Sequence, residues 1–233
     1  MLAIERWPDI LKADLETRRQ RLVQALQEVG IRLPADRDLQ GQLDRALVFS
    51  DFITESSICD PLLLNDLWNS GAVQRPTAAG AVASRLMACL EGSDGIDDLA
   101  GRLRRFRRRE MVRIAWRDLN GLADLTATTS DLSDLADACL NQTLAWLHAA
   151  QCAERDAPLS ADGTPMELVV LALGKLGARE LNFSSDVDLI FAFPGSGPPR
   201  EGEAEIDPED FFARLSRRLI QVIGQPTAEG QVF

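Results

Sequence analysis

The chain has 233 residues, of which 45% are hydrophobic, and 36 acidic against 25 basic residues give it a formal net charge of −11. This balance argues against nucleic acid as the main partner, because binding to phosphate backbones relies on clustered Lys and Arg. The longest uninterrupted apolar run, residues 168–173, is too short to span a membrane, and an early acid and proline argue against a secretory signal. We therefore expect a cytoplasmic globular protein of one or two domains.

The first 165 residues carry the apolar spacing of amphipathic helices almost throughout. In one of these helices an Asp-Pro pair stands at the start and a Gly at the end, which follows the usual capping preferences. The expected helical segments are 11–29, 39–53, 60–71, 77–90, an arginine-rich helix that begins near Leu99, and a long helix over 130–148 capped by Ser130.

Two short strands are expected after a polar turn at residues 158–165. The first strand is the apolar run 168–173, and the second covers residues 186–193. A glycine-bearing turn and a polar connection join them. A last helix is expected from Asp207-Pro208 to Gly224, because its start has a cap and a proline and its end has a glycine.

Two aspartates open the second strand. Asp186 and Asp188 are two residues apart, so on a strand both carboxylates point to the same face. Two such carboxylates at the end of a buried strand repel each other, and a divalent cation offsets this cost; Mg²⁺ is commonly held by one or two carboxylates and phosphate oxygens. Gly174 and Lys175 follow the first strand, where backbone N–H groups and an ammonium could meet phosphates. The pattern predicts nucleotidyl or phosphoryl transfer.

Neither half of this pattern is specific by itself. The Gly-Lys pair is not a P-loop, because Leu176 follows the lysine and the earlier glycine of that motif is lacking. An Asp-x-Asp pair at the end of a strand is also common as a solvated feature. The ordered combination of strand, glycine turn, Ser184-Ser185 and Asp-Val-Asp is far more specific for a metal and phosphate site.

This combination resembles the nucleotidyltransferase superfamily, in which a glycine-containing turn precedes an Asp-x-Asp that holds metal ions. Residues 173–191, LGKLGARELNFSSDVDLIF, are more specifically similar to the glutamine synthetase adenylyltransferases, bifunctional enzymes that add AMP to glutamine synthetase and remove it. The resemblance extends through residues 106–119 and 227–233. One departure is Ala178, where we expect a glycine in the family; a turn with positive φ there would be mildly strained by Ala.

The resemblance implies an α+β fold: a helical bundle over residues 1–157, then a nucleotidyltransferase domain from residue 158 to 233 with a mixed β-sheet and flanking helices. It implies that Asp186 and Asp188 are the catalytic residues and bind Mg²⁺. The residues it implies for nucleotide and phosphate binding are Gly174, Lys175, Arg179, Ser184 and Ser185.

The resemblance also implies partners and a direction of reaction. The arginine run and the following residues 113–119 are similar to the lead-in of the first of two tandem domains, which removes AMP by phosphorolysis. The implied partners are glutamine synthetase as protein substrate, ATP, ADP and phosphate, and the PII signal protein in the full-length enzyme. In the family a third carboxylate completes the metal site on a later strand. We expect it beyond Phe233, which leaves the domain incomplete at its C-terminus.

Two other functions stay open. A uridylyltransferase acting on PII has a similar local motif, but the helical lead-in fits it less well. A catalytically incomplete segment could act only as a binding or regulatory module.

Two groups of residues outside the motif are also of a type that can bind ligands. The arginines 102, 104, 105, 107, 108 and 109 form either a solvated face with acidic partners or an anion contact. The single histidine, His148, and four cysteines without CxxC pairing argue against a zinc site, a disulfide framework and a Ser-His-Asp triad.

Overall fold

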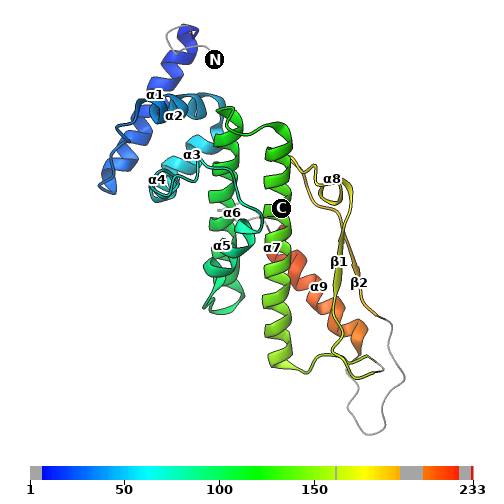
Figure 1. The fold of residues 1–233 in the computed structure, drawn as a ribbon. Coiled ribbons are helices and arrows are strands. Elements are labelled where there is room, and N and C mark those ends of the chain that lie inside the picture. Colours follow the sequence, from blue (N-terminus) through cyan, green and yellow to red (C-terminus); the bar gives the residue numbers. More distant parts are fainter. Residues whose placement is uncertain (1–6, 161, 195–206, 226–231, 233) are drawn as a thin grey trace. The chain divides into compact units, whose positions relative to one another are not determined.

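The computed structural model of the chain describes residues 7–160, 162–194, 207–225 and 232 (Figure 1). These residues form nine helices and two strands. In chain order they are α1 (Asp9–Glu28), α2 (Arg37–Phe49), α3 (Asp51–Cys59), α4 (Pro61–Asn69), α5 (Ala81–Leu90), α6 (Gly95–Leu119), α7 (Leu125–Glu154), β1 (Val169–Ala172), α8 (Gly174–Gly177), β2 (Leu189–Ala192) and α9 (Pro208–Gly224). None of the helices in these ranges is long and apolar enough to cross a membrane.

The packing divides the chain into two compact units. The first comprises residues 1–78 and 108–131, and the second comprises residues 79–107 and 132–233. Helices α6 and α7 each contribute one part to each of the two units. The domain boundary expected at residues 157 and 158 is a different division of the chain and stays a prediction.

The first unit is a helical bundle of α1 to α4 with the C-terminal half of α6. Trp116 is fully buried in it. Its indole Nε1 donates to Gln42 Oε1 at 3.0 Å, and its ring meets that of Trp68 edge to face with 6.4 Å between the centroids. The indole therefore has both of the partners that a buried tryptophan needs, an apolar surround and a hydrogen-bond acceptor.

One apolar stripe that we expected to form a single helix forms two. Ser50 is in an extended conformation, and its N–H donates to the carbonyl of Ala46 at the end of α2. The hydroxyl of Ser50 then accepts a 3.1 Å hydrogen bond from the N–H of Ile53 and caps α3. A serine that satisfies an open N–H at a helix start is a common cap, and here it breaks the stripe over residues 39–53.

The other expected helices are present, with two changes in where they begin. The helix capped by Asp60 is confirmed, and Gly71 follows its end with a φ of +66°. Helix α5 begins four residues later than expected, after Gly80 at a φ of +73°. The expectation that Ser130 caps the long helix is wrong: α7 begins at Leu125, and the carboxylate of Asp124 accepts from the N–H of Ala127.

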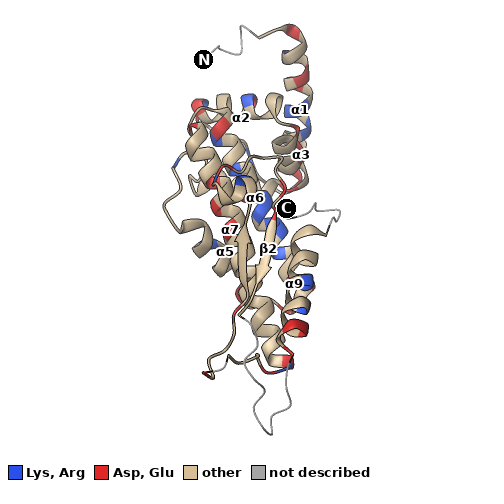
Figure 2. Ribbon diagram, turned by 90° about the vertical axis from the view of Figure 1, so that its right-hand side faces the viewer, with Lys and Arg blue, Asp and Glu red and all other residues tan. Residues whose placement is uncertain are grey.

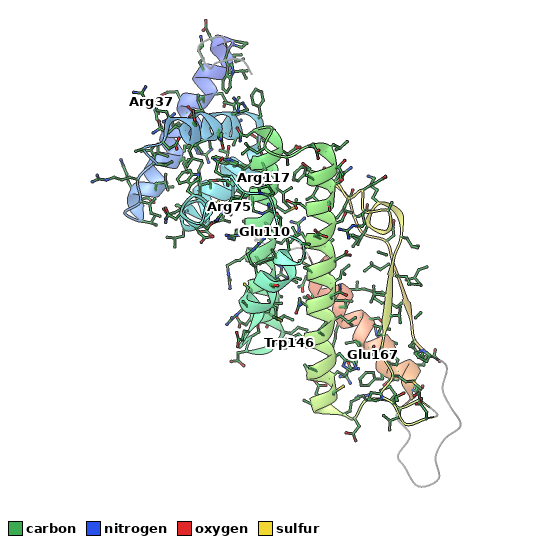
Figure 3. All side chains as sticks on the ribbon, in the orientation of Figure 1. Arg37, Arg75, Glu110, Arg117, Trp146 and Glu167 are labelled. Atoms are coloured by element: carbon green, nitrogen blue, oxygen red, sulfur yellow. The ribbon has the colours of Figure 1, made fainter. Side chains whose placement is uncertain are left out.

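Buried charges on α6 are paired inside the first unit. Arg113, only 2% exposed, donates to Glu110 Oε2 at 2.8 Å and to Asp131 Oδ2 at 3.0 Å. Arg109 donates to Asp66 at 2.7 Å and to Glu110 at 2.6 Å. Figure 3 labels Glu110 on this helix. Arg109 therefore has acidic partners, and so does Arg102, whose Nε donates to Asp98 at 2.9 Å. A possible anion contact of the other arginines in the run stays a prediction.

The second unit packs α9 between α7 and the two strands. Gln151 on α7 donates to the carbonyl of Phe211 at 2.8 Å, and the ring of His148 packs edge to face on the same phenylalanine. Phe212 stacks on Phe193 just after β2, with 4.8 Å between the centroids. Figure 2 shows the acidic start of α9 and the arginines further along it. Helix α9 is the expected last helix, capped by an aspartate.

The sheet is smaller than the expected mixed sheet. Within the described residues, β1 and β2 form one antiparallel pair, with Val169 opposite Ala192 and Ala172 opposite Leu189. Such a pair is marginal alone and depends on packing against a helix, here α9. The chain is therefore mostly helical with a small sheet, which agrees with the α+β class. Of the C-terminal segment 227–233, only residue 232 is described.

Candidate functional site

Asp186 and Asp188 lie immediately before β2, in an extended segment that leads into it, and not on the strand itself as expected. The alternation of a strand nevertheless continues through them. Asp186, Asp188 and Ile190 are exposed, whereas Val187 and Leu189 between them are half-buried. The two carboxylates therefore share the exposed face of the sheet.

The glycine turn contacts the second aspartate directly. The N–H of Leu173 donates to the carbonyl of Asp188 at 2.9 Å, which extends the pairing of β1 and β2 by one step. Gly174 follows with a φ of +55°, and a β-carbon on it would lie 3.5 Å from Oδ2 of Asp188. Gly174 and the carboxylate of Asp188, which are fourteen residues apart in sequence, thus lie side by side.

A second glycine closes the turn. Gly177 ends the short helix α8, and a β-carbon there would lie 2.5 Å from the carbonyl oxygen of Ala172. Real β-carbons essentially never approach a backbone oxygen so closely, so only glycine lets α8 fold back on the end of β1. Leu176, 3% exposed, anchors the turn in the core of the second unit.

The other expected phosphate-binding residues differ in how many hydrogen bonds engage them. Lys175 is exposed, and no hydrogen bond or ion pair engages its ammonium in the described part of the chain. Ser185 donates to Oδ1 of Asn182 at 2.7 Å and accepts from the N–H of Asn182 at 3.2 Å. The N–H of Ser184 donates to the same Oδ1 at 3.1 Å. The serines are therefore part of a loop centred on Asn182, and their contact with phosphate stays a prediction.

The strain expected at Ala178 lies one residue later. Ala178 has a φ of −83°, an ordinary helical value, whereas Arg179 has a φ of +59°. The Arg179 guanidinium forms ion pairs with Asp134 and with Asp137 of α7, the second at 3.1 Å. These two carboxylates hold the side chain that we expected at the phosphates, and a phosphate contact of Arg179 stays a prediction.

The charges near this turn affect one another. Burial raises the pKa of the Asp137 carboxyl, and Arg179 acts in the opposite direction. Hydrogen bonding to Asp134 raises the pKa of the Arg179 guanidinium. By contrast, no hydrogen bond or ion pair reaches the side chains of Asp186 and Asp188 from any residue that the structure describes.

Two unpaired carboxylates on one exposed face are suitable ligands for a divalent cation. Mg²⁺ prefers oxygen ligands and is often held by one or two carboxylates, with water and substrate phosphates in its other positions. Asp186 and Asp188 offer such a pair, and the exposed Lys175 follows the glycine that lies beside Asp188. Over the described ranges, no group of three or more His, Cys, Asp or Glu side chains is placed to hold a metal ion. The pair therefore fits Mg²⁺ as a partial donor set.

Sequence reasoning missed three residues that shape this site. Asn182 organises the serine loop, and Asp134 with Asp137 holds the glycine turn on α7. An Asn two residues before a Ser pair is a recognisable turn signal. The two aspartates on α7 read in the sequence as an ordinary polar helix face, because their partner is more than 40 residues away.

Comparison with known proteins identifies a family. A family profile described as glutamate-ammonia ligase adenylyltransferase matches residues 40–233. A relative from Thioalkalivibrio sulfidiphilus, named bifunctional glutamine synthetase adenylyltransferase/adenylyl-removing enzyme, is 46% identical over 191 residues, or 82% of this chain and 20% of the relative. Proteins of the same name from Pseudomonas aeruginosa and Nitrosococcus oceani are 43% and 41% identical, over 81% and 99% of this chain.

The chain spans about a fifth to a quarter of the length of these relatives, since the matches cover 20%, 19% and 24% of them. The matched profile covers most of the chain and includes the glycine turn and both aspartates. The expected resemblance is confirmed, and the chain belongs to the glutamate-ammonia ligase adenylyltransferase family.

Proposed function

We propose that this chain supplies the cation- and phosphate-binding part of a nucleotidyltransferase site that removes AMP from glutamine synthetase. The observation that carries the proposal is the position of Asp188 beside Gly174, where a β-carbon on the glycine would lie 3.5 Å from Oδ2 of the aspartate. It brings the glycine turn, in which Lys175 is the next residue, to the second of the two unpaired carboxylates. The names of the relatives supply the protein substrate, glutamine synthetase.

The reaction proposed for the site is phosphorolysis. An oxygen of inorganic phosphate forms a bond to the phosphorus of the adenylyl group, and the bond from that phosphorus to the tyrosine oxygen breaks. The proton of the phosphate passes to the tyrosine oxygen, so the products are ADP and unmodified glutamine synthetase. This chemistry needs little covalent help from the protein, because positioning and charge neutralisation provide most of the catalysis.

Each residue of the site has a role in this proposal. Asp186 and Asp188 would hold Mg²⁺, which neutralises charge on the phosphoryl group during transfer. Gly174 leaves room for a phosphate beside Asp188, because a side chain there would point at the carboxylate. Lys175 supplies a positive charge next to the glycine. Under this proposal the hydroxyls of Ser184 and Ser185, which directly precede Asp186, also bind phosphate.

The assignment to removal of AMP, and not to its addition, rests on the sequence before the site. The arginine run of α6 and residues 113–119 resemble the lead-in to the first of the family's two tandem domains. ATP, ADP, phosphate and the PII signal protein are partners of the whole protein under this proposal. A uridylyltransferase acting on PII is disfavoured, because the relatives that match over 81% to 99% of the chain carry the adenylyltransferase name.

The decisive experiment uses the protein at the length of its relatives, with this chain as its corresponding segment. Adenylylated glutamine synthetase is incubated with phosphate and Mg²⁺, and ADP formation and loss of AMP from the tyrosine are measured. Asp188→Asn keeps the shape of the side chain but removes its charge, so we expect phosphorolysis to fall at least about 10²-fold. Addition of AMP from ATP should be retained, because it belongs to the other domain.

Two outcomes would contradict the proposal. If Asp188→Asn removes the addition of AMP and spares phosphorolysis, the segment belongs to the other activity. If neither activity changes in Asp186→Asn or in Asp188→Asn, the segment is a binding or regulatory module. Arg155→Gln is a suitable control, because Arg155 pairs with Asp210 on α9 at 3.2 Å and does not contact the glycine turn.

A further inference from the structure

A polar contact fixes the glycine turn to α7. Arg179, which follows α8 by two residues, forms ion pairs with both Asp134 and Asp137. These aspartates are three residues apart on α7 and therefore lie on one face of the helix. The guanidinium has several N–H donors in one plane and can engage two carboxylates at once. Here the two carboxylates belong to residues that precede Arg179 by 42 and 45 positions in the sequence.

Further contacts join the same two elements. The N–H of Leu181 lies 3.4 Å from the hydroxyl oxygen of Ser133 on α7. Leu176 and Leu181 on either side of Arg179 are 3% and 1% exposed. Burial of these leucines attaches the turn to the core but is not directional. The ion pairs add direction, because a planar guanidinium between two carboxylates accepts few orientations.

The backbone at Arg179 is unusual and needs support. Among the described residues it is the single non-glycine residue with a positive φ, at +59°. An L-residue in this region costs about 1–2 kcal/mol. Arg179 N–H donates to the carbonyl of Leu176 at 2.9 Å, and the next N–H, of Glu180, donates to the carbonyl of Lys175 at 2.7 Å. The strained residue therefore closes the turn that carries Gly174 and Lys175.

We propose that Arg179 is a positioning residue, whose ion pairs to Asp134 and Asp137 hold the glycine turn on α7 in the orientation that places Gly174 against Asp188. This inference rests on the proposed function for its consequence at the cation site, but the attachment of the turn can be measured independently. It also gives Arg179 a different role from the phosphate ligand that the sequence predicts.

The test changes the two aspartates on α7, so that Arg179 and the rest of the turn keep their sequence. In Asp134→Asn/Asp137→Asn both carboxylates lose their charge while the turn keeps its sequence. Hydrogen exchange of the Glu180 and Leu181 amides should then rise about fivefold, the size that two half-exposed ion pairs support. Arg179→Gly should raise it too, although glycine accepts a positive φ without strain. The matched control is Glu154→Gln, which breaks a 3.2 Å ion pair between α7 and Arg218 and should leave these amides unchanged.

Mn²⁺ binding in the same variants separates positioning from direct phosphate contact. If Arg179 positions the turn, Asp134→Asn/Asp137→Asn weakens Mn²⁺ binding at the aspartate pair by about fivefold and does not strengthen phosphate binding. If Arg179 is a phosphate ligand, release from its two aspartates strengthens phosphate binding, and the proposal is overturned. Unchanged amide exchange in both variants would also overturn it. Failure of the wild-type chain to bind Mn²⁺ would count against the proposed function alone, because the exchange result would still decide whether Arg179 holds the turn.

Discussion

The carboxylate of Asp188 lies beside the α-carbon of Gly174, at a distance where a β-carbon on the glycine would be 3.5 Å from Oδ2. This relationship joins the two halves of a motif that are separate in the sequence. Gly174 has a positive φ of +55°, and a side chain on it would point at this carboxylate, so the glycine leaves the backbone beside Asp188 uncovered.

The first prediction concerns this glycine. Gly174→Ala should destabilise the second unit by only about 1 kcal/mol, the cost of an L-residue at positive φ, because 3.5 Å is ordinary contact distance. Its effect on phosphate binding should be larger than its effect on stability, because the new methyl group points to the carboxylate. Isothermal calorimetry and chemical denaturation on the same variant compare the two effects. Equal binding in Gly174→Ala and in the wild type would make the turn purely structural.

The second prediction separates Gly177 from Gly174. In Gly177→Ala the β-carbon meets the backbone oxygen of Ala172 at 2.5 Å, so the backbone must move, and we expect a loss of at least about 2 kcal/mol. Gly224→Ala at the end of α9 is the control, because nothing lies within 4 Å of its β-carbon and its φ is not positive. Urea denaturation checks both. Similar stabilities of the two variants would contradict the close approach of α8 to β1.

The third prediction concerns the buried charges of the first unit. Arg113→Met leaves the carboxylate of Glu110, which is fully buried, without one of its partners. We expect a loss of about 1.5–3 kcal/mol, because Glu110 keeps its ion pair with Arg109 but loses a hydrogen bond between charged groups. Adding Glu110→Leu should recover much of this loss, since apolar replacements of both partners are often tolerated. A double-mutant cycle from denaturation curves measures it, and additive losses would show that the pair is not coupled.

The fourth prediction is a titration. Burial raises the pKa of the Asp137 carboxyl, and the nearby Arg179 lowers it. Arg179→Gly should therefore raise the pKa of Asp137 further, which carboxyl-carbon NMR detects directly. Because the pKa in the folded state lies above the unfolded value, the stability that Asp137 contributes is present at low pH and is lost as the pH rises through the folded pKa. The stability of the wild type relative to Asp137→Asn should fall over that window, and a flat difference would contradict the assignment.

The sequence predicted the parts of this molecule that depend on local patterns. The cap at Asp60, the last helix after Asp207 and the run of buried residues on α7 follow from spacing and capping chemistry alone. The glycine turn and the aspartate pair were recognisable because cation and phosphate binding call for these residue types in this order.

The errors have physical reasons as well. Ser50 was expected inside a helix and Ser130 at the start of one, but Ser50 caps α3 and the carboxylate of Asp124 caps the start of α7 ahead of Ser130. The strain expected at Ala178 lies at Arg179, where two distant aspartates on α7 engage the side chain. Contacts across more than 40 residues leave no periodic signal, so the support of the site became visible only in the structure.

The central claim, that Asp186 and Asp188 jointly hold a divalent cation beside the glycine turn, is tested most directly by Mn²⁺ titration of the chain followed by amide NMR. Low Mn²⁺ concentrations should broaden the signals of residues 174–175 and 186–189 first. Asp186→Asn/Asp188→Asn should abolish this selective broadening and lower the affinity at least about tenfold, because the cation loses both charged ligands. Broadening that is equal in the wild type and the double variant, or that centres on another group of acidic residues, would contradict the account.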